Sequence, residues 1–152
     1  MNLINLLNPF SIIKIRPYYC CYFSILNFLY PLHIVCQKSE INIFEKGCVG
    51  LTITSILCNQ LFWINPVRYN FYHKIDGIVA KITFFYFLCY THYKQTLLIN
   101  QFFEYYFIIF MMGLTFYISN YYSSRNWCSY NHLYIHMIFH LFSSFGMVYA
   151  YK

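Results

Sequence analysis

Apolar residues fill five long stretches of the chain, and short polar segments separate them. A helix that crosses a bilayer needs about 20 mostly apolar residues, and these stretches approach that length with few charges. The predicted spans lie near 18–36, 48–64, 77–90, 98–118 and 131–149. The third is short and carries Lys81, whose long side chain can reach toward the membrane surface. The pattern predicts an all-α fold, a polytopic transmembrane helical bundle of about five spans.

The segments between the predicted spans are too short to form a separate soluble domain, and the chain shows no repeat of fixed period. We therefore expect residues 1–152 to form a single transmembrane domain. The N-terminal stretch NLINLLNPFSII is too short to span a bilayer and lacks the basic start and cleavage site of a signal peptide. We expect it to be retained as an interfacial segment.

Composition supports a membrane protein, because 60% of the residues are hydrophobic, 24% aromatic and only 9% charged. The net charge of +6 is shared between loops and forms no basic patch, which argues against nucleic acid as a partner. Lysine and arginine near the span ends are slightly more frequent on the side that holds the N-terminus. The positive-inside rule therefore places the N-terminus of this multi-pass integral membrane protein in the cytosol, by a small margin. The organelle is left open.

The seven cysteines show none of the paired spacings that build a zinc knuckle or a redox motif. Most are expected to fill apolar space. Cys36 and Cys48 flank one predicted loop and would be able to pair if that side faced an oxidising compartment, whereas free buried thiols are the alternative.

Three histidines lie at intervals of four in the stretch NHLYIHMIFHLFSSFG, residues 131–146. Positions four apart lie above one another on a helix, so His132, His136 and His140 form one stripe along the last predicted span. A polar group in the bilayer needs a partner, so the stripe is expected to face the bundle interior and meet a polar side chain or a metal. A hydrogen bond to serine, tyrosine or a backbone carbonyl is the structural alternative.

In a five-span chain the second span ends, the third begins and the fifth begins on the same side of the membrane. The second span carries Ser55 and Asn59, the loop after it carries His73, and the third span opens near Asp76. All of these residues are within reach of His136 in such a bundle. Paired imidazoles with a nearby carboxylate favour zinc as a cofactor.

These residues resemble the CREST superfamily of multi-pass membrane hydrolases, which includes the alkaline ceramidases and the progestin and adiponectin receptors. Ser55 in TSIL is similar to the family's serine, and Asp76 in HKIDGIVAKI to its aspartate. His136 and His140 in HMIFHLFSSFG look like its final histidine pair. The resemblance covers roughly 51–81 and 131–147.

The resemblance implies a zinc-dependent hydrolase of a lipid amide or ester, with His136 and His140 as metal ligands. Asp76 would take a proton from a bound water, and Ser55 would hydrogen-bond the developing oxyanion. Two features depart from the family: Asn59 stands where it has a histidine, and five predicted spans replace seven. His73 is then the expected replacement ligand, with His132 as an alternative.

Other readings stay open from the residues themselves. Asp76 would serve equally well as a helix cap, Ser55 as a packing residue, and His73 as a solvated loop residue. The chain would then be a non-enzymatic or degenerate membrane scaffold that binds no metal. Glu104 lies within the fourth predicted span and suggests a channel or transporter, although a pair with Lys94 or an interfacial position explains it as well.

Overall fold

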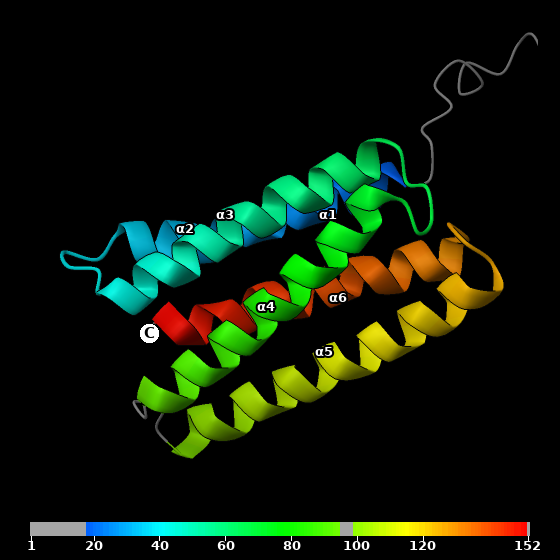
Figure 1. Ribbon diagram of the computed structural model, residues 1–152. Helices are drawn as coiled ribbons and strands as arrows, with labels where there is room; N and C mark the ends of the chain where they lie inside the picture. The colour runs from blue at the N-terminus through cyan, green and yellow to red at the C-terminus, as the bar shows by residue number, and fades with distance from the viewer. Residues whose placement is uncertain (1–17, 95–98, 152) are drawn as a thin grey trace, which may run out of the picture.

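The computed structural model describes residues 18–94 and 99–151 (Figure 1). Its elements are α1 (Tyr19–Ser24), the 3-10 helix η3 (Ile25–Phe28), α2 (Leu29–Cys36), α3 (Ile43–Ile64), α4 (Phe71–Lys94), α5 (Ile99–Arg125) and α6 (Tyr130–Tyr151). The described residues contain helices and no strand, which confirms the all-α prediction. The predicted interfacial segment near the N-terminus lies outside the described residues.

Within the described residues, four helical stretches are long and apolar enough to cross a membrane: Tyr19–Cys36, Ile43–Ile64, Gln101–Arg125 and Tyr130–Tyr151. The chain is therefore a multi-pass integral membrane protein. Helix α4 contains the predicted span 77–90 and is 24 residues long, but it is not among these four. Lys74, Asp76 and Lys81 make it more polar than the others. Its crossing of the membrane stays a prediction.

The first predicted span is a broken helix, because four residues of 3-10 geometry separate α1 from α2. A 3-10 segment changes the backbone hydrogen-bonding pattern, and a carbonyl within lipid needs a partner. The Ser144 hydroxyl on α6 donates to the Asn27 carbonyl in this segment at 2.7 Å. The break is therefore tied directly to the last helix.

Helix α3 begins five residues before the predicted span 48–64 because a capping box starts it. The Asn42 side chain accepts from the Glu45 amide at 2.8 Å, and the Glu45 carboxylate accepts from the Asn42 amide at 3.2 Å. Lys38 also donates to Glu45, and the Lys94 ammonium lies 3.8 Å from the same carboxylate oxygen. These contacts fasten the end of α4 to the start of α3.

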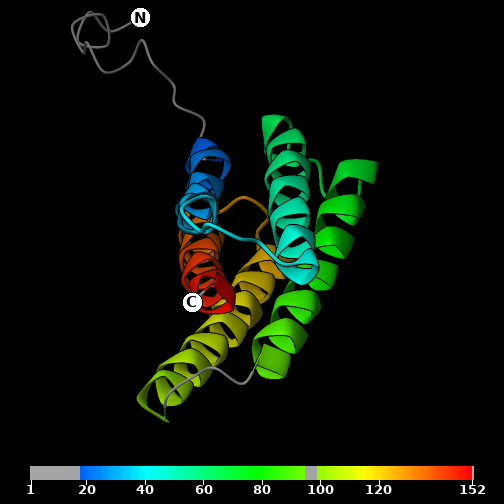
Figure 2. The same ribbon diagram turned by 90° about the vertical axis from the view of Figure 1, so that its left-hand side faces the viewer.

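Helix α6 is the central helix of the bundle and packs against α5, α4 and the first span (Figure 1). Figure 2 shows α6 beside α1 and α2, with α3 beside α4. Two buried clusters lie along α6. One contains Leu133 with Trp63 of α3, and the other contains Met147 with Phe87 of α4. His136 and His140 fall between these two apolar layers.

Candidate functional site

The histidine stripe faces the interior of the bundle. His132 and His140 are each 3% exposed, and His136 between them is half-buried. The ring centroids of His136 and His140 are 4.6 Å apart, and those of His132 and His136 are 5.9 Å apart. Three imidazoles thus form a continuous row along one face of α6.

Both ring nitrogens of His140 contact side chains from other helices. The Ser24 hydroxyl of α1 donates to the Cys21 carbonyl at 2.9 Å, so its oxygen is left to accept from His140 Nδ1 at 2.7 Å. A proton on Nδ1 leaves Nε2 as an acceptor. The Asn59 amide of α3 lies 3.4 Å from Nε2 and can donate to it. The partners therefore select the tautomer with a bare Nε2.

His136 also has a serine next to its Nδ1 atom, in this case from α5. Its Nδ1 lies 3.3 Å from the Ser119 hydroxyl, and Ser119 is 2% exposed. Its Nε2 is buried and has no hydrogen-bond partner among the described residues. The Trp63 ring packs beside the imidazole, with 5.4 Å between centroids. A buried nitrogen without a partner is unfavourable, so a ligand or a water at this atom would stabilise the site.

Asn59 connects the histidines to Asp76. Its side chain interacts with the Asp76 carboxyl group on α4 and hydrogen-bonds His140. The Asn59 Oδ1 atom is buried and has no hydrogen-bond partner among the described residues. One amide thus joins α3, α4 and α6. We call Ser24, Asn59, Asp76, Ser119, His136 and His140 the polar centre.

Asp76 is not the cap of its helix, because α4 begins five residues earlier, at Phe71. The Asn70 side chain accepts from the His73 amide at 2.7 Å and therefore caps this end. The capping alternative for Asp76 is wrong. Its carboxyl group lies more than one turn inside α4 and faces the Asn59 amide.

Ser55 lies one helical turn from Asn59 on α3 and is 7% exposed. Its hydroxyl is 2.9 Å from the Thr83 hydroxyl on α4. Two hydroxyls that share one hydrogen bond keep one proton free to donate elsewhere. The serine therefore borders the polar centre through Asn59 and is paired with Thr83 rather than with a histidine.

His73 and His132 stand outside the polar centre and have the same local geometry. The Tyr69 amide donates to His73 Nδ1 at 3.0 Å, and the Cys128 amide donates to His132 Nδ1 at 3.2 Å. Tyr69 and Cys128 adopt left-handed backbone angles, with φ of 62° and 57°. Each histidine thus stabilises a tight turn before its helix. Accepting at Nδ1 places the proton on Nε2, so neither ring presents a bare Nε2.

The environment of His73 is aromatic rather than polar. Its ring centroid lies 5.0 Å from that of Phe62 and 5.3 Å from that of Trp127. Burial, and secondarily the charge of Arg68, lowers the pKa of His73. The neutral form, which accepts the Tyr69 amide, is therefore favoured at neutral pH.

No three His, Cys, Asp or Glu side chains within residues 18–94 and 99–151 are placed to hold one metal ion. The polar centre supplies two adjacent imidazoles, and its two buried atoms without partners are a nitrogen of His136 and an oxygen of Asn59. Imidazole nitrogen is a usual donor to zinc, whereas the usual oxygen donor is a carboxylate rather than an amide. Ser24 and Ser119 also orient the two rings from behind, as outer residues do in metal sites. The polar centre thus offers two imidazole donors and a neighbouring amide oxygen, and no third His, Cys, Asp or Glu ligand within the described residues.

Glu104 on α5 has a different partner from the one expected. The Tyr149 hydroxyl on α6 donates to its carboxylate at 2.7 Å, while Lys94 lies near Glu45.

All seven cysteines are free, so Cys36 and Cys48 form no disulfide. The Asn42 and Glu45 pair was readable as a capping box three residues apart, whereas Ser24 and Ser119 carried no signal in the sequence.

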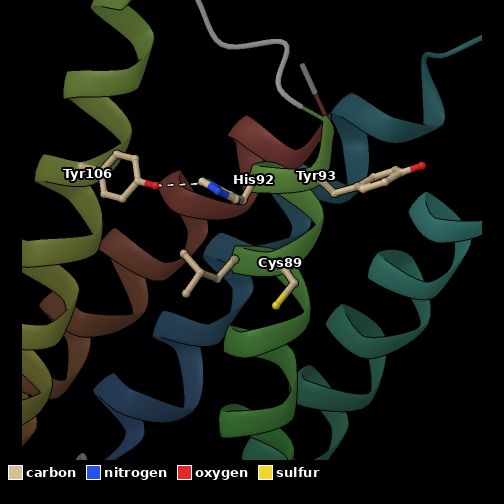
Figure 3. Close-up of a pocket in the computed structure, with 5 residues that line it drawn as sticks. Cys89, His92, Tyr93 and Tyr106 are labelled. Carbon is tan, nitrogen blue, oxygen red and sulfur yellow. Dashed lines mark hydrogen bonds between the residues drawn. The ribbon is translucent and has the colours of Figure 1, made fainter.

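A separate cavity of about 900 Å³ lies between α4 and α5 (Figure 3). Cys89, His92 and Tyr93 line it from α4, and Tyr106 lines it from α5. The Tyr106 hydroxyl is 3.4 Å from His92 Nδ1. This cavity shares no residue with the polar centre.

The fold and the polar centre together define a multi-pass membrane protein with imidazole, amide and carboxyl groups gathered between its helices. No family model matches the chain, and no curated protein or solved structure is significantly similar to it. The resemblance to membrane hydrolases therefore rests on the residues alone.

Proposed function

We propose that the chain is a zinc-dependent hydrolase that acts on an amide or ester of a membrane lipid. The observation that carries the proposal is the contact of Asn59 with both His140 and Asp76. It joins three helices that bear the residues resembling the membrane hydrolases. A scaffold would allow these side chains to face different neighbours.

His136 and His140 are the proposed ligands, through their Nε2 atoms, and Asn59 Oδ1 is the proposed oxygen donor. The support is that His140 carries its proton on Nδ1 and that the other two atoms have no hydrogen-bond partner among the described residues. His73 is assigned to its helix cap, because binding through Nε2 would remove the proton that its contact with Tyr69 places there. Bound zinc would supply a water of lowered pKa and polarise a carbonyl group.

The chain's own residues supply the remaining roles. Asp76 receives the proton of the attacking water at its carboxylate, which the Asn59 amide holds in place. The hydroxyl pair of Ser55 and Thr83 keeps one proton to donate to the developing oxyanion. Ser24 and Ser119 fix the orientation of the two imidazoles.

The setting of the site favours a lipid substrate. Apart from Asp76, the residues of the polar centre lie on stretches long and apolar enough to cross a membrane, so a lipid would approach them from the bilayer without entering water. The orientation with a cytosolic N-terminus belongs to the same proposal and rests on the distribution of lysine and arginine.

The test is metal removal from the detergent-purified protein, followed by an assay against a panel of fluorescent lipid amides and esters. Hydrolysis should stop after chelation and return on addition of zinc, but not of magnesium, because imidazole donors suit zinc and magnesium prefers oxygen. If no lipid of the panel is cleaved by zinc-loaded protein, the proposal is wrong.

A non-enzymatic membrane scaffold is the second candidate, and one observation favours it. The Asn59 amide already meets His140 Nε2, at the position where the related hydrolases have a histidine. A hydrogen-bonded network of this kind would hold the helices together without any metal. In that case the purified protein contains no zinc, and chelation changes nothing.

A further inference from the structure

An apolar groove of about 660 Å³ lies between the first span and α6. Tyr19, Cys20, Phe23, Ser24 and Asn27 line it from the first span, and Tyr134, Met137, Ile138 and Leu141 line it from α6. Both walls belong to membrane-spanning stretches, so the groove opens toward lipid. Its surface is mostly hydrocarbon and aromatic, with polar groups at a few points.

One of these polar groups connects the groove to the polar centre. The Ser24 hydroxyl lines the groove and also accepts from His140 Nδ1 at 2.7 Å. Ser24 is 9% exposed, so the groove and the imidazole are separated by this one side chain. A molecule in the groove therefore lies on the Nδ1 side of His140, behind the ring that would hold the metal through Nε2.

The second polar group is the Asn27 side chain, which is exposed near the middle of the span Tyr19–Cys36. The Asn27 backbone carbonyl accepts from Ser144, whereas no hydrogen bond joins its carboxamide to another described residue. A carboxamide facing lipid without a partner is unfavourable. Because it offers both a donor and an acceptor, it suits an ester or amide linkage.

We infer that this groove binds one hydrocarbon chain of the substrate lipid, and that Asn27 hydrogen-bonds the lipid's ester or amide linkage beside Ser24. The inference rests on the proposed function and adds a site that holds the lipid next to the polar centre. Asn27 is then a positioning residue, and the aromatic and aliphatic walls select a chain rather than a head group. Asn27 and Ser24 both line the groove on the Nδ1 side of His140, so a lipid held there lies beside the histidine from which the proposed site is built.

The experiment is photolabelling of the full chain in phosphatidylcholine nanodiscs with an N-acyl amide lipid that carries a diazirine in its chain. It is run on the wild type and on the His136→Ala, His140→Ala double variant, which cannot consume the probe through the proposed site. Label should concentrate in residues 19–27 and 134–141 of both proteins. The readout thus depends on occupancy of the groove and not on hydrolysis.

Two groove variants and one control sharpen the result. Asn27→Leu should lower labelling about fivefold, the effect of one lost hydrogen bond. Ile138→Trp should remove most of the labelling by filling the groove. Leu57→Trp, at a position on α3 that is 56% exposed, should leave it unchanged. Labelling is compared only between proteins whose melting temperatures match that of the wild type, so that loss of fold is not mistaken for loss of binding.

Labelling in the groove with no detectable zinc or hydrolysis would keep the lipid site and overturn only the enzyme. Equal labelling of the groove and of other lipid-facing surfaces, such as that of α5, would overturn the inference. A dimer in single-molecule photobleaching that disappears in Asn27→Leu would assign the groove to a second copy of the chain, which also overturns it.

Discussion

Four histidines lie close together in this bundle, and they form two pairs that differ in what contacts Nδ1. In His73 and His132 a backbone amide donates to Nδ1, which places the proton on Nε2. In His140 the Ser24 oxygen accepts from Nδ1, and in His136 a serine hydroxyl lies in the same place. The first pair, the capping pair, stabilises two turns. In the second, the central pair, His140 Nε2 is contacted by the Asn59 amide, and His136 Nε2 has no hydrogen-bond partner among the described residues.

The comparison shows that position in the stripe does not decide the role of a histidine. His132 and His136 are neighbours on one face of α6, yet one contacts the turn before its own helix and the other contacts α5. The difference comes from the left-handed residue Cys128, which directs its amide toward His132. The partner supplied by the surrounding backbone therefore separates a structural histidine from a candidate ligand.

The largest expected effect is on the chemistry next to the central pair. Asp76→Asn should lower lipid hydrolysis by about 10²- to 10⁴-fold, because the variant loses the group that takes the proton. Zinc content should stay unchanged, since the Asn59 and histidine donors remain. Initial rates and elemental analysis of the same preparation give both values.

Glu40→Gln is the matched control for Asp76→Asn, since Glu40 is an exposed acidic residue before α3. It should leave the rate unchanged. If Asp76→Asn retains full activity, the assignment of Asp76 as the base is wrong.

An intermediate effect is expected when the central pair is made into a triad. Asn59→His places an imidazole where the hydrolases that these residues resemble have one, and a third nitrogen ligand should tighten zinc binding about tenfold or more. Competition with a zinc-sensitive fluorescent chelator measures the change. Asn59→Gln, which keeps an amide, serves as the control.

An unchanged zinc affinity in a folded Asn59→His protein would contradict the placement of Asn59 against the ion. It would leave the two histidines as ligands with a different oxygen donor. The zinc affinity of this variant therefore tests the role of Asn59 separately from the role of the two histidines.

The smallest expected effect is on the capping pair. His73→Ala should lower the free energy of unfolding by about 1 kcal/mol, the usual effect of one lost hydrogen bond, and leave zinc content unchanged. Thermal unfolding of wild type and variant in the same detergent measures the loss. A loss of zinc together with stability would instead place His73 at the metal.

The effect of His73→Ala on stability should depend on pH. The pKa of His73 is lowered in the folded protein, so below its ordinary value of about 6.5 the unfolded chain binds more protons than the native one. Stability contributed by neutral His73 is therefore full above that pH and is lost as pH falls toward the lowered value. The fall in melting temperature between neutral and mildly acidic pH should be smaller in His73→Ala than in the wild type.

The hydrophobic pattern was sufficient to predict the helices but not their ends. The start of α3 depends on the Asn42 capping box, and the start of α4 depends on Asn70, both short polar signals beside strongly apolar stretches. The break at Ile25–Phe28 carries no glycine and has no clear mark in the sequence. It becomes understandable only from the Ser144 contact across the bundle.

The candidate site could be predicted in part. Helical spacing placed His136 and His140 together, and the order of the spans brought Asp76 near them. Ser24 and Ser119 could not be found, because a serine in a membrane helix is common and its partner depends on how the helices are rotated. The different roles of His73 and His136 could not be predicted from the sequence either, because the contact of His73 depends on the backbone angle of Tyr69.

The most direct test of the account is zinc content per chain in three purified proteins: the wild type, the central-pair variant His136→Ala, His140→Ala, and the capping-pair variant His73→Ala, His132→Ala. We predict about one zinc in the wild type, none in the central-pair variant and about one in the capping-pair variant, provided each is folded. A wild type without zinc, or equal loss from both variants, would contradict the account and make all four histidines structural.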